Sequence, residues 1–301
     1  MRPIKCVAIG LALAMAAPAA AQGPVAAASA TLERPDGSAI HYHLHRPGAA
    51  RRPLLVMLQG SGCDSVTRND RIPWMAERLA PDHVLLTIEK YGVAPGDDGE
   101  TCSADHWRGN TLQQRALDVL HVVAALRGEP WWNGELVLFG GSEGGAVAAL
   151  AAPLAHGARA VIIWSSGLGQ PVGEMIRSVL PPQVREEADG IFAEARRNPT
   201  GALQWGGASY RWWADAVDLV PARSLVQTRA PILMIHGSRD QFAPIASARA
   251  ARDLMRAAER PNLTYREYEG YDHFMVDAGG VDRRAEVVRE AATWLRRTRR
   301  R

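Results

Sequence analysis

Apolar residues along this chain form short continuous runs separated by segments with helical periodicity. The runs lie within residues 53–62, 83–92, 135–142, 158–167, 230–240 and 263–274. Continuous apolar runs of this length are typical of strands that are buried on both faces of a parallel sheet. Helical spacing of apolar residues follows in 72–80, in 111–129, after Ser142, and from about Asp282 onward. The alternation predicts an α/β fold with a mostly parallel, doubly wound sheet.

An N-terminal hairpin is predicted ahead of this sheet. The segment "ATLERPDGSAIHYHLHRP" places a Pro-Asp-Gly turn between two candidate strands. In the second strand His41, His43 and His45 alternate, so they share one face. Such a row can bind a metal, but no carboxylate or cysteine accompanies it, and a solvated strand face is the favoured interpretation.

Residues 168–229 interrupt the alternation. No clear strand is expected there, the pattern is helical, and Trp205, Trp212 and Trp213 lie within it. The segment is too long for a simple connection between sheet elements. We therefore predict a helical cap insertion over the carboxyl edge of the sheet, where it would exclude water and shape a pocket.

The first 21 residues predict an exported protein. Arg2 and Lys5 precede a short apolar stretch, and small residues before Gln22 fit a cleavage site. Residues 1–21 are thus expected to be a signal peptide, and residues 22–301 a periplasmic or secreted domain with no transmembrane segment. Two cysteines remain after cleavage, Cys63 and Cys102. In an exported protein we expect them to form a disulfide, with two free thiols as the alternative.

Composition narrows the range of partners. Hydrophobic residues make up 47% of the 301 residues and the formal net charge is +3, as in a globular protein with a sizeable core. So small a charge indicates no nucleic-acid partner. The spacing of histidines, cysteines and carboxylates fits no metal site, and no cofactor is expected. A small-molecule ester or a short peptide is the expected substrate.

The strongest chemical signal is the segment Gly140-Gly141-Ser142-Glu143-Gly144. It lies between a predicted strand and a predicted helix. A tight turn there lifts the serine hydroxyl above the sheet and crowds the backbone, so the neighbours of the serine must lack side chains. Ser142 is therefore the candidate nucleophile.

A serine nucleophile needs a base, and the base needs an orienting acid. Asp240 and His273 each follow a later predicted strand. Because carboxyl ends of parallel strands meet at one edge of a sheet, these groups can converge on Ser142. Asp272 is a rival acid, but a sequence neighbour of the histidine points away from it on an extended segment. His236 is interpreted as a packed residue at a strand end.

An oxyanion hole needs two backbone N–H donors. One is expected from Glu143, the residue after the nucleophile, and the other from the loop "LQGSGC" after an earlier strand. Ser61 is the preferred donor in that loop, with Gly62 and Cys63 as alternatives.

As a set, these motifs resemble the α/β-hydrolase superfamily over nearly all of residues 22–301. The elbow Gly-Gly-Ser-Glu-Gly-Gly is similar to that of dienelactone-hydrolase-like and prolyl-oligopeptidase-like members. The resemblance implies an α/β-hydrolase fold and a Ser-His-Asp hydrolase. One departure is Gln59, where many members carry histidine; because the donor is a backbone N–H, the change should matter little to catalysis.

Three functions remain to be weighed. The favoured one is an exported serine hydrolase, a carboxylesterase acting through an acyl-enzyme. A serine peptidase is the alternative; a capped aminopeptidase would need cap carboxylates facing the site, and the cap offers Glu186, Glu187, Asp189 and Glu194. A catalytically inactive binding protein is the third, and an intact set of three catalytic residues argues against it.

Overall fold

A computed structural model describes residues 27–45, 50–201 and 203–298 of the chain. The predicted signal peptide, residues 1–21, lies outside the described residues. The main sheet has eight strands in the order β1-β2-β4-β3-β5-β6-β9-β10. β1 and β2 form the predicted N-terminal hairpin, and β2 is antiparallel to β4. The other pairs are parallel.

The strands match the apolar runs of the sequence. Their bounds are β1 (Ala27–Glu33), β2 (Ala39–His45), β3 (Arg52–Leu58), β4 (Val84–Ile88), β5 (Trp132–Gly141), β6 (Ala158–Trp164), β9 (Ile232–Gly237) and β10 (Leu263–Tyr268). Alternate side chains of one strand enter different cores: Leu136 and Leu138 of β5 belong to one cluster, Val137 and Phe139 to the other. The sheet is thus buried on both faces, which explains the continuous apolar runs.

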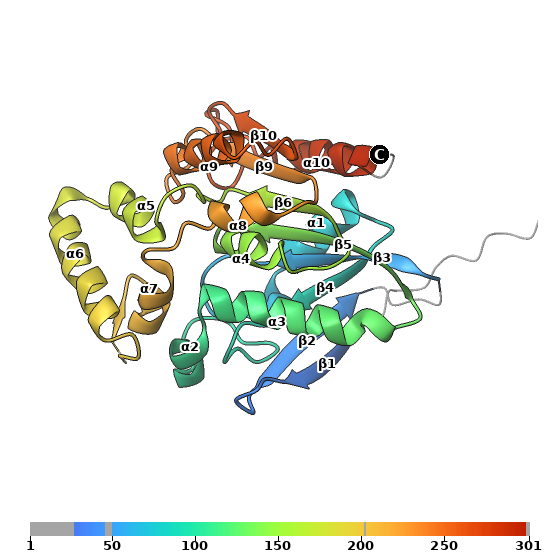
Figure 1. The fold of residues 1–301 in the computed structure, drawn as a ribbon, viewed down its shortest axis with the longest axis horizontal. Helices are drawn as coiled ribbons and strands as arrows, with labels where there is room; N and C mark the ends of the chain where they lie inside the picture. Colours follow the sequence, from blue (N-terminus) through green and yellow to red (C-terminus); the bar gives the residue numbers. More distant parts are fainter. Residues whose placement is uncertain (1–26, 46–49, 202, 299–301) are drawn as a thin grey trace, which may run out of the picture.

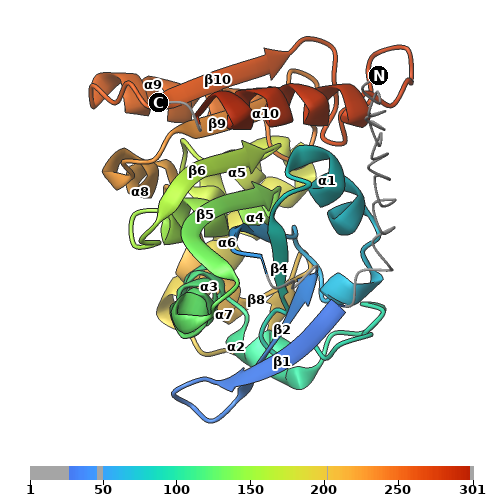
Figure 2. The same cartoon turned by 90° about the vertical axis from the view of Figure 1, so that its right-hand side faces the viewer.

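Helices cover both faces of the sheet (Figures 1 and 2). One core is completed by α1 (Arg71–Leu79) and α10 (Arg284–Thr298). The other is completed by α3 (Leu112–Ala125), α4 (Glu143–Ala151), α8 (Ala222–Gln227) and α9 (Ile245–Ala257). The expected doubly wound, mostly parallel architecture is confirmed.

The predicted cap is present as a group of helices beside the sheet (Figure 1). It contains α5 (Val172–Val179), α6 (Pro182–Arg197) and α7 (Tyr210–Ala216). The expectation of no strand here was wrong: β7 (Gln204–Trp205) and β8 (Ala208–Ser209) form a small hairpin. Gly206 and Gly207 both have positive φ, which a two-residue hairpin turn requires. α8 contacts α4 and α9, so the last part of residues 168–229 covers the sheet.

Two further details differ from the sequence interpretation. A short helix, α2 (Ala104–Gly109), and two 3-10 turns, η1 (Val66–Arg68) and η2 (Leu126–Gly128), had no periodicity to predict them. The histidine face of β2 is also less solvated than expected. His43 is buried, and its ring lies between the Ser29 hydroxyl (2.8 Å) and the Glu89 carboxylate (3.1 Å). His43 is therefore a buried, hydrogen-bonded side chain and not part of a solvated strand face.

No helix among the described residues is both long and apolar enough to cross a bilayer.

The disulfide links the loops that follow two neighbouring strands. β3 and β4 pair in parallel, and Cys63 and Cys102 lie in the loops after them. Their sulfur atoms are bonded and their Cα atoms are 5.5 Å apart. The expected Cys63–Cys102 bridge is thus present, and it closes a sequence separation of 39 residues.

Replacing both cysteines by serine should destabilise the protein. A loop of this length restricts the unfolded chain by about 4 kcal/mol in the chain-entropy description. We expect Cys63→Ser/Cys102→Ser to lower the free energy of unfolding by roughly that amount in urea titrations. Equal stability of the double variant and the wild type would contradict a stabilising role for the bridge.

Candidate active site

Ser142 occupies a sharp turn between β5 and α4. Its backbone has φ 52° and ψ −126°, a left-handed conformation that is costly for a residue with a side chain. Its N–H donates to Trp164 O at 2.9 Å, and its carbonyl accepts from Gly145 N–H at 2.9 Å. The predicted strand-to-helix elbow is therefore present, with Ser142 at its apex.

Close packing explains the glycines of the elbow. A Cβ added at Gly140 would lie 2.1 Å from Gly144 O, and one at Gly144 would lie 2.2 Å from Leu58 O. A Cβ at Gly145 would lie 2.6 Å from the Ser166 Cβ. These contacts are with backbone or with the base of a side chain, which cannot move away cheaply. The first turn of α4 is thus pressed against the end of β3.

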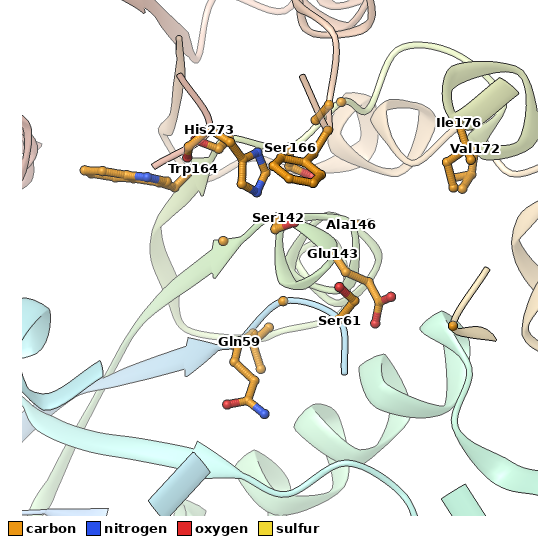
Figure 3. Close-up of a pocket in the computed structure, with 18 of the residues that line it drawn as sticks. Gln59, Ser61, Ser142, Glu143, Ala146, Trp164, Ser166, Val172, Ile176 and His273 are labelled. Carbon is orange, nitrogen blue, oxygen red and sulfur yellow. The ribbon is translucent and has the colours of Figure 1, made fainter. Parts of the chain in front are cut away.

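The loop after β3 lies beside Ser142. A Cβ added at Gly60 would be 3.2 Å from the Ser142 Cβ and 3.6 Å from its Oγ. Ser61 follows in this loop, and Glu143 begins α4; both line the same cavity as Ser142 (Figure 3). The two residues expected to supply backbone donors are therefore together at the elbow.

His273 and Asp240 meet as expected from their places after β10 and β9. The His273 Nδ1 lies 2.8 Å from Asp240 Oδ2. The other carboxylate oxygen accepts the backbone N–H groups of Phe242 (2.9 Å) and Ala243 (2.8 Å), so Asp240 is buried with its lone pairs occupied. The rival Asp272 accepts the N–H groups of its own loop instead.

The imidazole of His273 points toward Ser142 across the cavity (Figure 3). Both residues line that cavity. The His273 backbone is held by Ser165, whose hydroxyl donates to His273 O at 2.8 Å. Phe242 and Phe274 both contact the ring edge to face, each with its centroid 5.2 Å from that of His273, and they also contact each other. The histidine is therefore held at its backbone, at Nδ1 and by two aromatic contacts.

His236 contacts Asp240, and the sequence analysis did not predict this contact. It is fully buried, and its Nε2 lies 2.6 Å from Ala243 O and 3.4 Å from Asp240 Oδ2. A carbonyl only accepts, so Nε2 carries a proton. Burial lowers the pKa of His236, which favours the neutral form of this ring.

A large apolar cavity of about 930 Å³ surrounds Ser142. The cap and the sheet loops both contribute to it, chiefly through aliphatic and tryptophan side chains: Val172, Met175, Ile176, Val179, Leu180, Val184, Trp74, Trp164, Trp205, Trp212 and Trp213. Among the described residues that line it, Glu143 is the one carboxylate, whereas Arg71 and Arg284 are cations. The cavity suits an apolar ligand without a strong positive charge.

A buried lysine lies beneath the loop after β3. The Lys90 ammonium donates to Gly62 O at 2.6 Å and is almost fully buried. Burial, reinforced by the nearby Arg115 guanidinium, lowers the pKa of Lys90 to about 7. Burial, with the nearby Lys90 as the next cause, lowers the pKa of His106 to about 4. The loop beside Ser142 is therefore held by a buried lysine with a depressed pKa.

Gly144→Ala should destabilise the fold through the elbow. The added methyl meets the Leu58 carbonyl, and overpacking of this kind costs about 3 kcal/mol. Gly190→Ala is a matched control: it lies within α6 with open space around its Cα, and we expect a gain of about 0.5–1 kcal/mol. Chemical denaturation measures both. Comparable stabilities of the two variants would refute the close packing.

Lys90→Met should change how stability depends on pH. Between pH 7 and 10.5 the unfolded chain holds a proton on Lys90 that the folded protein has lost, so the wild type gains stability as pH rises through this window. The difference in free energy of unfolding, variant minus wild type, should therefore fall from pH 7 to pH 10. Urea titrations at several pH values measure it, and a constant difference would contradict the depressed pKa.

Comparison with known proteins supports the fold. No protein-family model matches the chain, and no curated protein matches it in sequence. Among solved structures it is similar to Est1E from Butyrivibrio proteoclasticus with ferulic acid bound, at 19% identity and a TM-score of 0.65, covering 88% of this chain and 98% of that one. It is also similar to Porphyromonas gingivalis dipeptidyl peptidase 4, at 13% identity and a TM-score of 0.64.

The extent of the two similarities differs. This chain spans only 36% of the length of the dipeptidyl peptidase, although 91% of this chain is covered. The similarity to a crystal structure of puromycin hydrolase has the same extent, with 19% identity and a TM-score of 0.63. It covers 92% of this chain and 39% of that one. In each comparison the similarity covers about nine tenths of this chain. The chain therefore has the α/β-hydrolase fold.

Proposed function

We propose that this protein is a serine hydrolase that cleaves carboxylic esters with a large apolar group. The observation that carries the proposal is the Asp240–His273 hydrogen bond of 2.8 Å, which orients the imidazole toward Ser142 at the apex of the elbow. A nucleophile, a base and an orienting acid on one cavity form the arrangement that acyl transfer requires.

In the proposed mechanism, His273 Nε2 removes the proton of the Ser142 hydroxyl as the oxygen attacks the ester carbonyl. Asp240 holds the Nδ1–H tautomer and stabilises the imidazolium that forms. The backbone N–H groups of Ser61 and Glu143 receive the oxyanion, and one such donor contributes about 3 kcal/mol. His273 then protonates the leaving alcohol, and water releases the acyl group by the same steps in reverse roles.

The charges around the cavity favour an ester over an amino-terminal peptide. A substrate ammonium would need a carboxylate, and none of the cap carboxylates that the structure describes lines the cavity. Glu187 accepts from the Trp205 indole N–H at 2.8 Å, Asp189 pairs with Arg177, and Glu194 pairs with Arg197. Glu186 is exposed. The one lining acid, Glu143, is paired with Arg115. A peptidase is therefore less well supported.

The cavity also suggests the kind of group that is bound. Its walls are apolar and aromatic, and its volume of about 930 Å³ exceeds what a short acyl chain needs. Est1E, the structural neighbour with ferulic acid bound, binds an aromatic carboxylic acid. Phe242 and Phe274 stand 62% and 47% exposed at the site, which is a surface for a further apolar part of the substrate. Export, which the N-terminal segment predicts, would place this reaction outside the cytoplasm.

Kinetics on p-nitrophenyl esters test the proposal. We expect residues 22–301 to hydrolyse esters of medium and long acyl chains, and Ser142→Ala to lose activity by about 10⁴-fold or more. Ser166→Ala is the control, because this serine lines the same cavity while the hydrogen bonds that hold His273 come from Asp240 and Ser165, and it should keep most of the activity. Faster cleavage of amino-acid p-nitroanilides than of the esters would favour the peptidase. Turnover that is the same in Ser142→Ala would refute the mechanism.

A further inference from the structure

Arg115 is a buried cation that the proposed reaction does not use. It lies on α3 and is buried, and it is not among the described residues that line the cavity with Ser142 and His273. Its guanidinium donates hydrogen bonds to two different parts of the fold. One nitrogen lies 2.6 Å from Glu143 Oε1, and the other lies 2.6 Å from Gln59 O. A single side chain therefore joins the elbow to the loop after β3.

These two partners belong to the two segments that carry the expected oxyanion donors. Glu143 is itself one of those donors through its N–H, and Gln59 begins the loop that continues through Gly60 to Ser61. A peptide plane is rigid, so fixing the Gln59 carbonyl also fixes the direction of the Gly60 N–H. Gly60 in turn packs on Ser142, because a Cβ added at Gly60 would lie 3.2 Å from the serine Cβ.

The other end of the loop is also held, by a hydrogen bond and by the disulfide. Lys90 donates to Gly62 O at 2.6 Å, and Cys63 is bonded to Cys102. Along this loop, the Gln59 carbonyl is bound by Arg115 and the Gly62 carbonyl by Lys90. Between them lie Gly60 and Ser61, which line the cavity together with Gln59.

The elbow and the loop come from β5 and β3, so their relative position is not fixed by a shared turn. Donors must lie within a fraction of an ångström of the developing oxyanion to stabilise it. The planar fork of arginine can satisfy two acceptors in a defined geometry, which a lysine ammonium cannot reproduce. A fork between Glu143 and Gln59 is therefore suited to hold the two halves of the site in register.

We propose that Arg115 is a positioning residue that locks the loop 59–62 to the elbow and so aligns the oxyanion donors. The inference rests on the proposed hydrolase function. Because Arg115 lies outside the apolar cavity, its loss should affect the transition state and leave substrate binding almost unchanged. The expected signature is a lowered kcat with an unaltered KM.

Arg115→Lys tests this role, with Arg34→Lys as the matched control. Arg34 is also buried, and its guanidinium binds both oxygens of the Asp118 carboxylate at 2.9 and 2.8 Å, but it lies at the turn of the N-terminal hairpin and does not line the cavity. We expect Arg115→Lys to reduce kcat by about 10²-fold with KM unchanged, as small misplacements do. Arg34→Lys should lose stability and retain kcat.

Three measurements make the outcome decisive. Wild-type ester turnover is measured first, since its absence would reject the proposed function rather than the role of Arg115. Melting temperatures then show whether both lysine variants fold. If Arg115→Lys does not fold, Glu143→Gln replaces it: this variant keeps an oxygen acceptor, removes the charge, and should lower kcat less, again with KM unchanged. A folded Arg115→Lys or Glu143→Gln with wild-type kcat would overturn the proposal, as would an equal loss of kcat in Arg34→Lys.

Discussion

The site depends on one close contact, the packing of the β5–α4 turn against the end of β3. The Cα of Gly144 lies so near the Leu58 carbonyl that no side chain fits, and Ser142 is held in a left-handed conformation beside it. This contact brings the nucleophile to the loop that is expected to hold the oxyanion. Strain at Ser142 is tolerated because the two surrounding cores, which share β5, leave the turn no alternative path.

Around this contact, the polar groups are arranged in layers. Ser142, His273 and Asp240 lie at the carboxyl ends of three strands, as a parallel sheet requires. Neutral His236 and the backbone N–H groups of Phe242 and Ala243 surround the acid. Beneath the loop after β3 lie the buried Arg115 and Lys90, whose hydrogen bonds hold the Gln59 and Gly62 carbonyls. Above it, the cap supplies an apolar wall that excludes water.

Much of this could be predicted from the sequence, for reasons that are local. The elbow around Ser142 could be predicted from its glycines, and the residues at strand ends could be predicted from the apolar runs before them, because both patterns are local in the sequence. His43 and Arg115 could not be read in this way, since their partners, Glu89 and Gln59, lie 46 and 56 residues away in the chain. The cap hairpin was missed because strands of two residues have no periodicity. The sequence showed that the cap contains carboxylates, but it could not show that their side chains do not line the cavity.

The most direct test of the account is the identity of the residue that a serine-reactive fluorophosphonate modifies. The protein would be labelled, digested and analysed by peptide mass spectrometry, with His273→Ala in parallel. The account predicts a single adduct on the peptide that contains Ser142, formed far more slowly without His273. An adduct on another serine, or labelling of Ser142 at the same rate in His273→Ala, would contradict the central claim that His273 activates Ser142.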